Sequence, residues 1–146
     1  MKLNKIRFYL HNKDYIIHEI ALLANSISEY KEYNDISITV TLKENIQTSS
    51  DKKSNVEFSA INRLDNIDIL LKKIEELQKI KLAIESTLLY LDENQKKIVE
   101  MRYFSKTGET NSFTYISKIL NYSTRYIKLI DKIIITKIND KYTELT

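Results

Sequence analysis

Apolar residues recur at helical spacing over most of the chain. Over residues 2–33 they recur at helical spacing, at Ile6, Leu10, Ile17, Ile20, Ala21, Leu23, Ala24 and Ile27. A second stripe with the same period follows, at Leu64, Ile67, Leu71, Ile74, Leu77, Ile84, Leu88 and Leu91. This spacing places apolar side chains on one face of an α-helix. The pattern predicts an N-terminal helix and one long central helix from Glu57 to about Leu91.

Residues 34–56 interrupt this period. Alternate positions are apolar, at Ile36, Ile38, Val40 and Leu42, which is the pattern of a strand. No second strand pattern is present to pair with it, so an extended arm fits equally well. The polar stretch IQTSSDKKSN that follows predicts a loop or linker.

The last third of the chain predicts three shorter helices. Acidic residues at Asp92–Glu93 suit a helix N-terminus, and a short helix continues to Phe104. The loop SKTGETNS holds the one glycine, Gly108. A helix over residues 113–120 comes next, then a two-residue break. Ser123 is a good N-cap for a last helix that runs to about Ile138.

The amino-acid composition excludes several fold classes and several kinds of chemistry. The 146 residues include one glycine, no proline and no cysteine. Glycine-rich phosphate loops and tightly turned β-folds are therefore excluded, as are disulfides, zinc fingers and thiol catalysis. No segment is apolar enough for a signal peptide or a membrane span. We expect an all-α, soluble, cytoplasmic protein.

Positive charge is concentrated towards the C-terminus. Residues 1–101 carry 15 Lys/Arg and 16 Asp/Glu, whereas residues 102–146 carry 8 and 4. A basic segment with a folded, periodic sequence favours a polyanionic partner, and nucleic acid is the usual one. The alternative is a solvated lysine-rich face without a partner.

The basic segment SFTYISKILNYSTRYIKLIDKIIITKI has the pattern of a helix-turn-helix. Its inner faces are apolar, at Ile116, Leu120, Ile127, Ile130, Ile134 and Ile138. The outer face of the second helix enters the major groove in such motifs, where arginine reads guanine and lysine reaches guanine or phosphate. The free N–H groups at Ser123 can receive a phosphate. The predicted DNA-binding residues are Ser123, Thr124, Arg125, Tyr126, Lys128, Leu129 and Lys132.

The segment from about Leu91 to Ile138 resembles region 4 of bacterial sigma-70-type factors. The likeness lies in IVEMRYF, which ends the preceding helix, and in Phe113, Ile116, Leu120, Ser123 and Ile127. The chain departs from the pattern at Ser117, Asn121 and Leu129, where the family usually has alanine, glycine and often glutamine. No aromatic cluster of the promoter-melting type is present upstream.

The upstream half of the chain resembles small phage proteins of the ArpU/RinA late-gene activator type, which share an N-terminal helix, a polar stretch, one long helix and a sigma-region-4-like end. The stretches SDKKSNVEFSAI and LDENQKKIVEMRYF carry the likeness. The resemblance implies a transcriptional regulator from a phage or mobile element that binds double-stranded DNA and acts on host RNA polymerase at the bacterial nucleoid. It implies no cofactor.

Two domains are expected: residues 1–91, with the N-terminal helix, arm and long helix, for packing or dimerisation, and residues 92–146 for DNA binding. A helix of about 35 residues spans roughly 50 Å, more than the few other elements can cover. It is expected to pair with a second copy of the chain, or with the N-terminal helix folded back along it, and both arrangements are compatible.

Other functions stay open. The chain fits a DNA-packaging recognition protein like a small terminase subunit, which would form rings, or a module that binds polymerase or a repressor without DNA. His11, Asp14 and His18 have metal-ligand spacing, but no fourth ligand is evident. No paired carboxylates or nucleophile motif predict an enzyme. We expect no catalysis, cofactor or metal.

Overall fold

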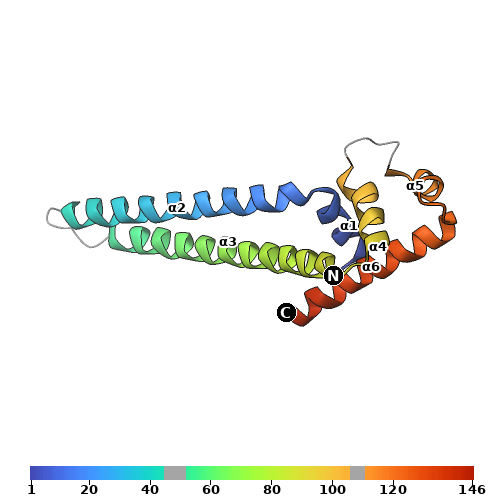
Figure 1. Ribbon diagram of the computed structural model, residues 1–146. Helices are drawn as coiled ribbons and strands as arrows, with labels where there is room; N and C mark the ends of the chain where they lie inside the picture. Colours follow the sequence, from blue (N-terminus) through green and yellow to red (C-terminus); the bar gives the residue numbers. More distant parts are fainter. Residues whose placement is uncertain (45–51, 106–110) are drawn as a thin grey trace. The chain divides into compact units, whose positions relative to one another are not determined.

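The computed structural model describes residues 1–44, 52–105 and 111–146, with side chains described for residues 1–32, 64–105 and 111–146. Over these ranges the chain is all-α and has no strand. The elements are α1 (Leu3–His11), α2 (Lys13–Glu44), α3 (Lys52–Leu89), α4 (Glu93–Val99), the π-helical turn η1 (Glu100–Phe104), α5 (Phe113–Leu120) and α6 (Thr124–Leu145) (Figure 1). None of these helices has a stretch long and apolar enough to cross a membrane.

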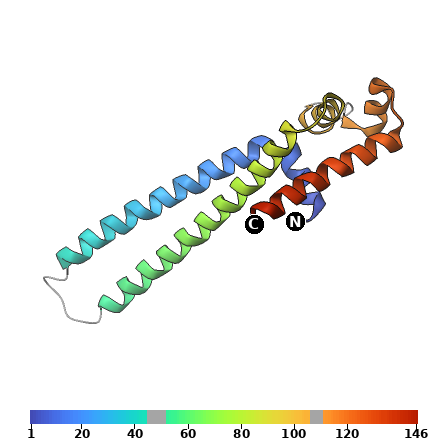
Figure 2. The same ribbon diagram turned by 60° about the horizontal axis from the view of Figure 1, so that its bottom comes forward.

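The chain divides into two compact units. The first unit combines Met1–Ile16 with Gln78–Thr146, and the second unit is Ile17–Leu77. The second unit contains most of α2 and α3, which run antiparallel and side by side (Figures 1 and 2). The domain boundary that we predicted after residue 91 falls inside the first unit.

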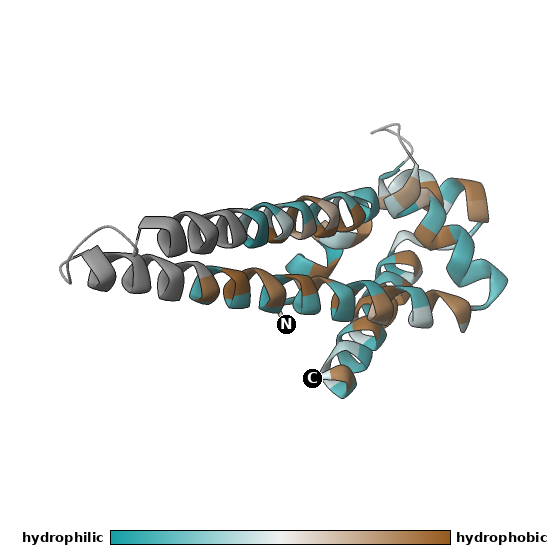
Figure 3. Cartoon of the chain, turned by 90° about the vertical axis from the view of Figure 1, so that its left-hand side faces the viewer, coloured by the Kyte–Doolittle hydropathy of each residue, from teal (hydrophilic) through white to brown (hydrophobic). Residues whose placement is uncertain are grey.

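Isoleucine dominates the core of the first unit. The side chains that are almost completely buried there come from several helices, namely Ile6, Leu10, Ile16, Ile80, Ile84, Ile98, Val99, Ile116, Ile127, Ile134, Ile135 and Ile138. Burying one such side chain stabilises the fold by roughly 1.5–3 kcal/mol. Apolar and polar positions alternate around the helices accordingly (Figure 3). Helix α1 packs against both α6 and η1, so both ends of the chain build this core.

Side chains fix the starts of the helices in the first unit. The Asp92 carboxylate accepts a hydrogen bond from the Gln95 N–H at 2.8 Å, and the Gln95 side chain accepts one from the Asp92 N–H at 3.4 Å. This reciprocal capping box satisfies two otherwise unpaired backbone donors. Ser112 caps α5 by accepting from the Tyr115 N–H at 3.1 Å. The helix start predicted at Asp92 is confirmed.

The N-terminal helices differ from the prediction in two places. The helix expected over residues 2–33 is divided at Asn12, whose side-chain amide donates to the Phe8 carbonyl at 2.8 Å. Helix α2 then continues through residues 36–42 to Glu44, so the strand or extended arm predicted there is wrong. Alternating β-branched residues favour a strand only when a second strand can pair with them. Helical hydrogen bonds satisfy the backbone here without a partner.

Helix α3 confirms the long central helix. It begins at Lys52, within the stretch predicted as a loop, and the rest of that loop lies outside the described residues. The predicted stripe is buried at Ile67, Leu77 and Ile84, whereas Leu64 and Leu71 are 57% and 48% exposed. The N-terminal helix therefore does not cover these two leucines. Residues 106–110 of the predicted loop around Gly108 also lie outside the described part.

Candidate nucleic-acid interface

Helices α5 and α6 pack against each other and are joined by a short turn. Asn121 ends α5 in the left-handed conformation, with φ 57° and ψ 35°, and its N–H bonds to the Ser117 carbonyl. The Ser117 hydroxyl donates to the Tyr122 carbonyl at 2.6 Å. Ser123 caps α6 by accepting from the Tyr126 N–H at 3.1 Å. The bounds of α5 and the Ser123 cap agree with the prediction, whereas α6 continues to Leu145, beyond the end predicted near Ile138.

The inner faces of this two-helix unit are buried as predicted. Ile116, Ile127, Ile134 and Ile138 are almost fully buried, Ile130 is buried, and Leu120 is half-buried. Tyr122 in the turn is half-buried, and its hydroxyl accepts from the Asn94 amide at 3.1 Å. This hydrogen bond attaches the turn to α4. The buried inner faces pack both helices onto the rest of the first unit.

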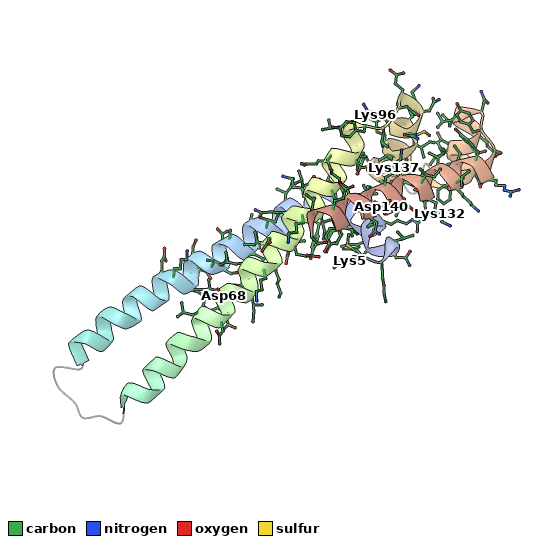
Figure 4. The ribbon with its side chains drawn as sticks, turned by 90° about the horizontal axis from the view of Figure 1, so that it is seen from below. Lys5, Asp68, Lys96, Lys132, Lys137 and Asp140 are labelled. Carbon is green, nitrogen blue, oxygen red and sulfur yellow. The ribbon has the colours of Figure 1, made fainter. Side chains whose placement is uncertain are left out.

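The outer face of α6 presents the predicted basic side chains together. Arg125, Lys128 and Lys132 are exposed, and their spacing of three and four residues puts them on one side of the helix. Figure 4 shows Lys132 on α6. The Lys128 ammonium also lies 6.0 Å from the centre of the Phe113 ring of α5. Leu129, 54% exposed, lies one turn after Arg125 at the edge of this basic side.

The other predicted residues contribute less surface. Thr124 is half-buried at the start of α6, and the Ser123 hydroxyl already serves as the cap. Tyr126 is 41% exposed, and its ring lies 4.8 Å from the Tyr122 ring. The predicted DNA-binding residues therefore form two groups. The exposed cations and Leu129 form the outer surface of α6, whereas the side chains at the start of α6 mainly shape the turn.

Sequence reasoning missed several residues of the same unit. Lys118 and Ile119 of α5 are exposed beside the turn, and Lys137 is exposed further along α6. Lys137 follows Lys132 by five residues, about 140° around the helix, so it does not continue the face of Arg125, Lys128 and Lys132. Lys5 belongs to α1, which packs on α6 (Figure 4), and no local signal in the sequence predicts that packing.

The start of α5 is fixed from η1. The Arg102 guanidinium carbon lies 4.1 Å from the centre of the Phe113 ring, and Arg102 Nη1 donates to the Asn111 carbonyl at 2.5 Å. A π-helical turn inserts an extra residue into a helix and is frequent at functional sites. In this chain it directs Arg102 towards α5 and Tyr103 into the core.

A buried charge network joins α1 to α6. Asp131, 2% exposed, accepts a hydrogen bond from Arg7 Nη2 at 3.1 Å and another from the Tyr103 hydroxyl. Burial, followed by the hydrogen bond and charge of Asp131, raises the pKa of Tyr103. Burial lowers the pKa of Arg7, but the hydrogen bond and charge of Asp131 outweigh it and raise that pKa overall. At neutral pH Tyr103 is thus a neutral donor and Arg7 a cation.

The difference in net charge is larger between the two compact units than between the two parts of the linear sequence. The first unit carries 16 Lys/Arg and 9 Asp/Glu, whereas the second unit carries 7 and 11. The basic residues of α1 add to those of the C-terminal helices, a grouping that a linear division of the sequence does not reveal. The unit that contains α5 and α6 is therefore the basic one.

His11, one of the three residues with metal-ligand spacing, packs against a tyrosine ring. The His11 ring lies 4.7 Å from the Tyr103 ring, across the contact between α1 and η1. Burial and the charge of Arg102 lower the pKa of His11, and Asp131 opposes this. The described residues contain no group of three His, Asp or Glu side chains that could hold a metal ion.

An apolar groove lies on another side of the first unit. Its volume is about 500 Å³, and its apolar lining comes from Leu88, Leu89, Val99 and Phe104. Charged side chains of both signs, Lys13, Glu85, Lys96 and Glu100, complete the lining. This composition suits an amphipathic protein segment better than a nucleic acid.

No protein-family model, curated protein or solved structure gives a significant match to the chain.

Proposed function

We propose that this chain is a sequence-specific, double-stranded DNA-binding transcriptional regulator of a phage or mobile element. In this proposal α5, the turn and α6 act as a helix-turn-helix resembling sigma-70 region 4, and α6 enters the major groove. The carrying observation is the exposed row of Arg125, Lys128 and Lys132 next to a capped turn whose inner face is packed. A rigid helix with one basic side is what groove recognition requires.

Each exposed group then has a distinct role on DNA. Arg125, in the first turn of α6, is suited to bidentate bonding with guanine, and Lys128 reaches guanine or phosphate. Leu129 offers an apolar contact for a thymine methyl group. Lys132 lies further along the helix and neutralises phosphate, and the α6 N-terminus at Ser123 and Thr124 attracts another phosphate. Tyr126 adds a phosphate contact at the edge.

Host RNA polymerase is the second proposed partner. The resemblance to sigma factors covers region 4 alone, so we propose that the protein works with a host holoenzyme rather than as a sigma factor. The groove of Leu88, Leu89, Val99 and Phe104 supports a protein partner in addition to DNA. The site of action would be the nucleoid of a bacterial cell.

Two alanine variants test the DNA contacts separately. On a site selected from random duplexes, Arg125→Ala should lose about 1–3 kcal/mol and relax the preference at one base position. Lys132→Ala should weaken all duplexes alike and reduce the salt slope by about one. Lys72→Ala, an exposed lysine of α3 in the second unit, is the control. If both variants bind like the control, α6 is not the reading helix.

An in-vitro transcription assay distinguishes the regulatory modes. Core polymerase with this protein should give no transcript, and addition of the host sigma factor should give more transcript than holoenzyme alone. Transcription by core enzyme alone would make the protein a sigma factor, and a decrease with holoenzyme would make it a repressor. A ring-sized mass in solution would favour the DNA-packaging alternative, whereas an effect on polymerase without DNA affinity would favour a protein-interaction module.

A further inference from the structure

The second unit is a two-helix hairpin with one buried stripe on each helix. Ile27 of α2 and Ile67 and Leu77 of α3 are buried. Their neighbours on the same stripes are half-buried, namely Ile20, Leu23, Tyr30, Leu70 and Ile74. Two antiparallel helices cover only the surfaces that face each other, and stable bundles of this kind usually bury further apolar faces between more helices.

A second stripe lies directly beside the buried one on each helix. On α2 it consists of the exposed residues Ile17, Ala21, Ala24, Ser28 and Lys31. On α3 it consists of Leu64, Asp68, Leu71 and Glu75, which are all exposed. Each exposed stripe follows its buried stripe by one residue, which is a rotation in the same sense on both helices. Because the helices are antiparallel, both exposed stripes lie on the same face of the hairpin.

We propose that this face binds the same face of a second copy of the chain, so that two hairpins form a four-helix bundle. A two-fold axis parallel to the helices sets α3 of one copy against α2 of the other. Counted back from the end of α2 at Glu44 and forward from the start of α3 at Lys52, Ala24 and Leu71 lie level along the hairpin. Each Leu71 then packs into the space that Ala21 and Ala24 leave on the partner.

The charges on this face are complementary under the same symmetry. Counted from the same two helix ends, the positions of Lys31 and Asp68 differ by about three residues, or roughly 4.5 Å along the axis. A lysine side chain easily reaches across such an offset. Lys31 of one copy and the partner's Asp68 therefore form an ion pair on each side of the two-fold axis. Figure 4 shows the Asp68 side chain on α3.

A second copy fits this face better than an unrelated partner does. Leucines and small residues occur on the same face as Lys31 and Asp68, and these positions match each other when the face is duplicated. Isologous pairing of this kind is how most homodimers form. This face shares no residue with the proposed DNA-binding surface of α6, so variants can test the two proposals separately.

Mass in solution tests the proposal on the full-length protein. Sedimentation equilibrium should give the dimer mass for the unaltered chain and the monomer mass for Leu71→Asp. Ile69→Asp is the matched control, because Ile69 is 51% exposed on the opposite side of α3 while Leu71 is 48% exposed. Circular dichroism should show the same helix content for both variants. A monomeric unaltered chain, a larger assembly, or equal effects of the two substitutions would overturn the proposal.

A charge exchange tests the register. Lys31→Glu and Asp68→Lys should each raise the dimer Kd about tenfold, since each places like charges together on the seam. The double variant should return the Kd to that of the unaltered chain. If the double variant is as weak as the single ones, Lys31 and Asp68 do not meet across the dimer.

Introduced cysteines give a second measure that does not depend on affinity. The chain has no cysteine of its own, so new disulfides are unambiguous. A mixture of Ala24→Cys and Leu71→Cys chains should oxidise to the mixed dimer faster than either chain alone forms its own dimer. Faster formation of either homodimer would contradict the pairing of α2 with α3 of the partner.

Discussion

Asp131 shows how a single residue can link distant parts of the chain. Among the described side chains it is the only charged one that is buried. A buried carboxylate is tolerated only when charge and hydrogen bonds compensate its lost hydration. Arg7 and Tyr103 supply both, from α1 and η1. The inner side of the proposed reading helix is therefore fixed by a residue near the N-terminus.

Removing Arg7 should cost more than removing an ordinary surface lysine. Arg7→Ala leaves Asp131 buried without its cation, and breaking a buried pair costs about 3–5 kcal/mol. The Arg7 side chain is 33% exposed, so we expect the loss to be roughly 2–3 kcal/mol because solvent screens part of the interaction. Urea unfolding measures it, with Lys2→Ala as a control within about 0.5 kcal/mol. Equal losses for the two variants would show that the network adds no stability.

His11 should make stability depend on mildly acidic pH. Its pKa in the folded protein is lowered by burial and the Arg102 charge, from a usual value near 6.5. Below about pH 6.5 the unfolded chain therefore binds a proton that the folded protein still excludes. Stability should fall as the pH is lowered through this range, and His11→Gln should reduce the slope. His18→Gln serves as the control. A slope unchanged by His11→Gln would mean that other groups cause the pH dependence.

The left-handed residue of the α5–α6 turn should determine how well this pair of helices forms. Asn121 has φ 57°, a conformation that costs a β-carbon-bearing residue roughly 1–2 kcal/mol. Asn121→Gly should keep or raise the free energy of unfolding, whereas Asn121→Val should lower it by about 1–2 kcal/mol. Thermal denaturation measures both, with Thr114→Val on the exposed side of α5 as control. Equal stability of Asn121→Val and Asn121→Gly would contradict this explanation of the turn.

Local signals account for the elements that were predicted well. Ser123 and Asp92 are caps whose bonds involve residues only three positions away, so the sequence shows both partners. The alternation over residues 36–42 was misleading because strand formation depends on a second strand, which the chain lacks in the described ranges. Arg7 and Asp131 stand 124 residues apart, and no pattern in the sequence indicates their pairing. The exposed basic face of α6 could be predicted, but the support from α1 could not.

At the scale of the whole molecule, the basic unit is built from both ends of the chain. Met1–Ile16 belongs with Gln78–Thr146, and the hairpin of the second unit is inserted between them in the sequence. Ile6 and Leu10 from α1, and Ile80 and Ile84 from α3, are part of its core. The C-terminal helices alone therefore lack a large share of the apolar surface on which they pack.

This arrangement predicts that residues 92–146 alone will not fold. The fragment loses Ile6, Leu10, Ile80 and Ile84, each contributing roughly 1.5–3 kcal/mol, which together approach the roughly 5–15 kcal/mol that typically stabilises a whole domain. It also leaves Asp131 without Arg7. We expect narrow amide dispersion in its NMR spectrum, low helix content and no specific DNA binding.

A second shortened chain separates this explanation from a need for the whole protein. Met1–Ile16 joined to Gln78–Thr146 by a flexible glycine-serine linker restores all four apolar residues and Arg7, while the second unit is absent. It should regain dispersed NMR signals, a cooperative thermal transition and affinity for single DNA sites. If residues 92–146 alone gave the same spectrum and affinity, α1 would be dispensable. If the joined chain also failed to fold, the hairpin would be required for the stability of the basic unit, and the two compact units would not be independent.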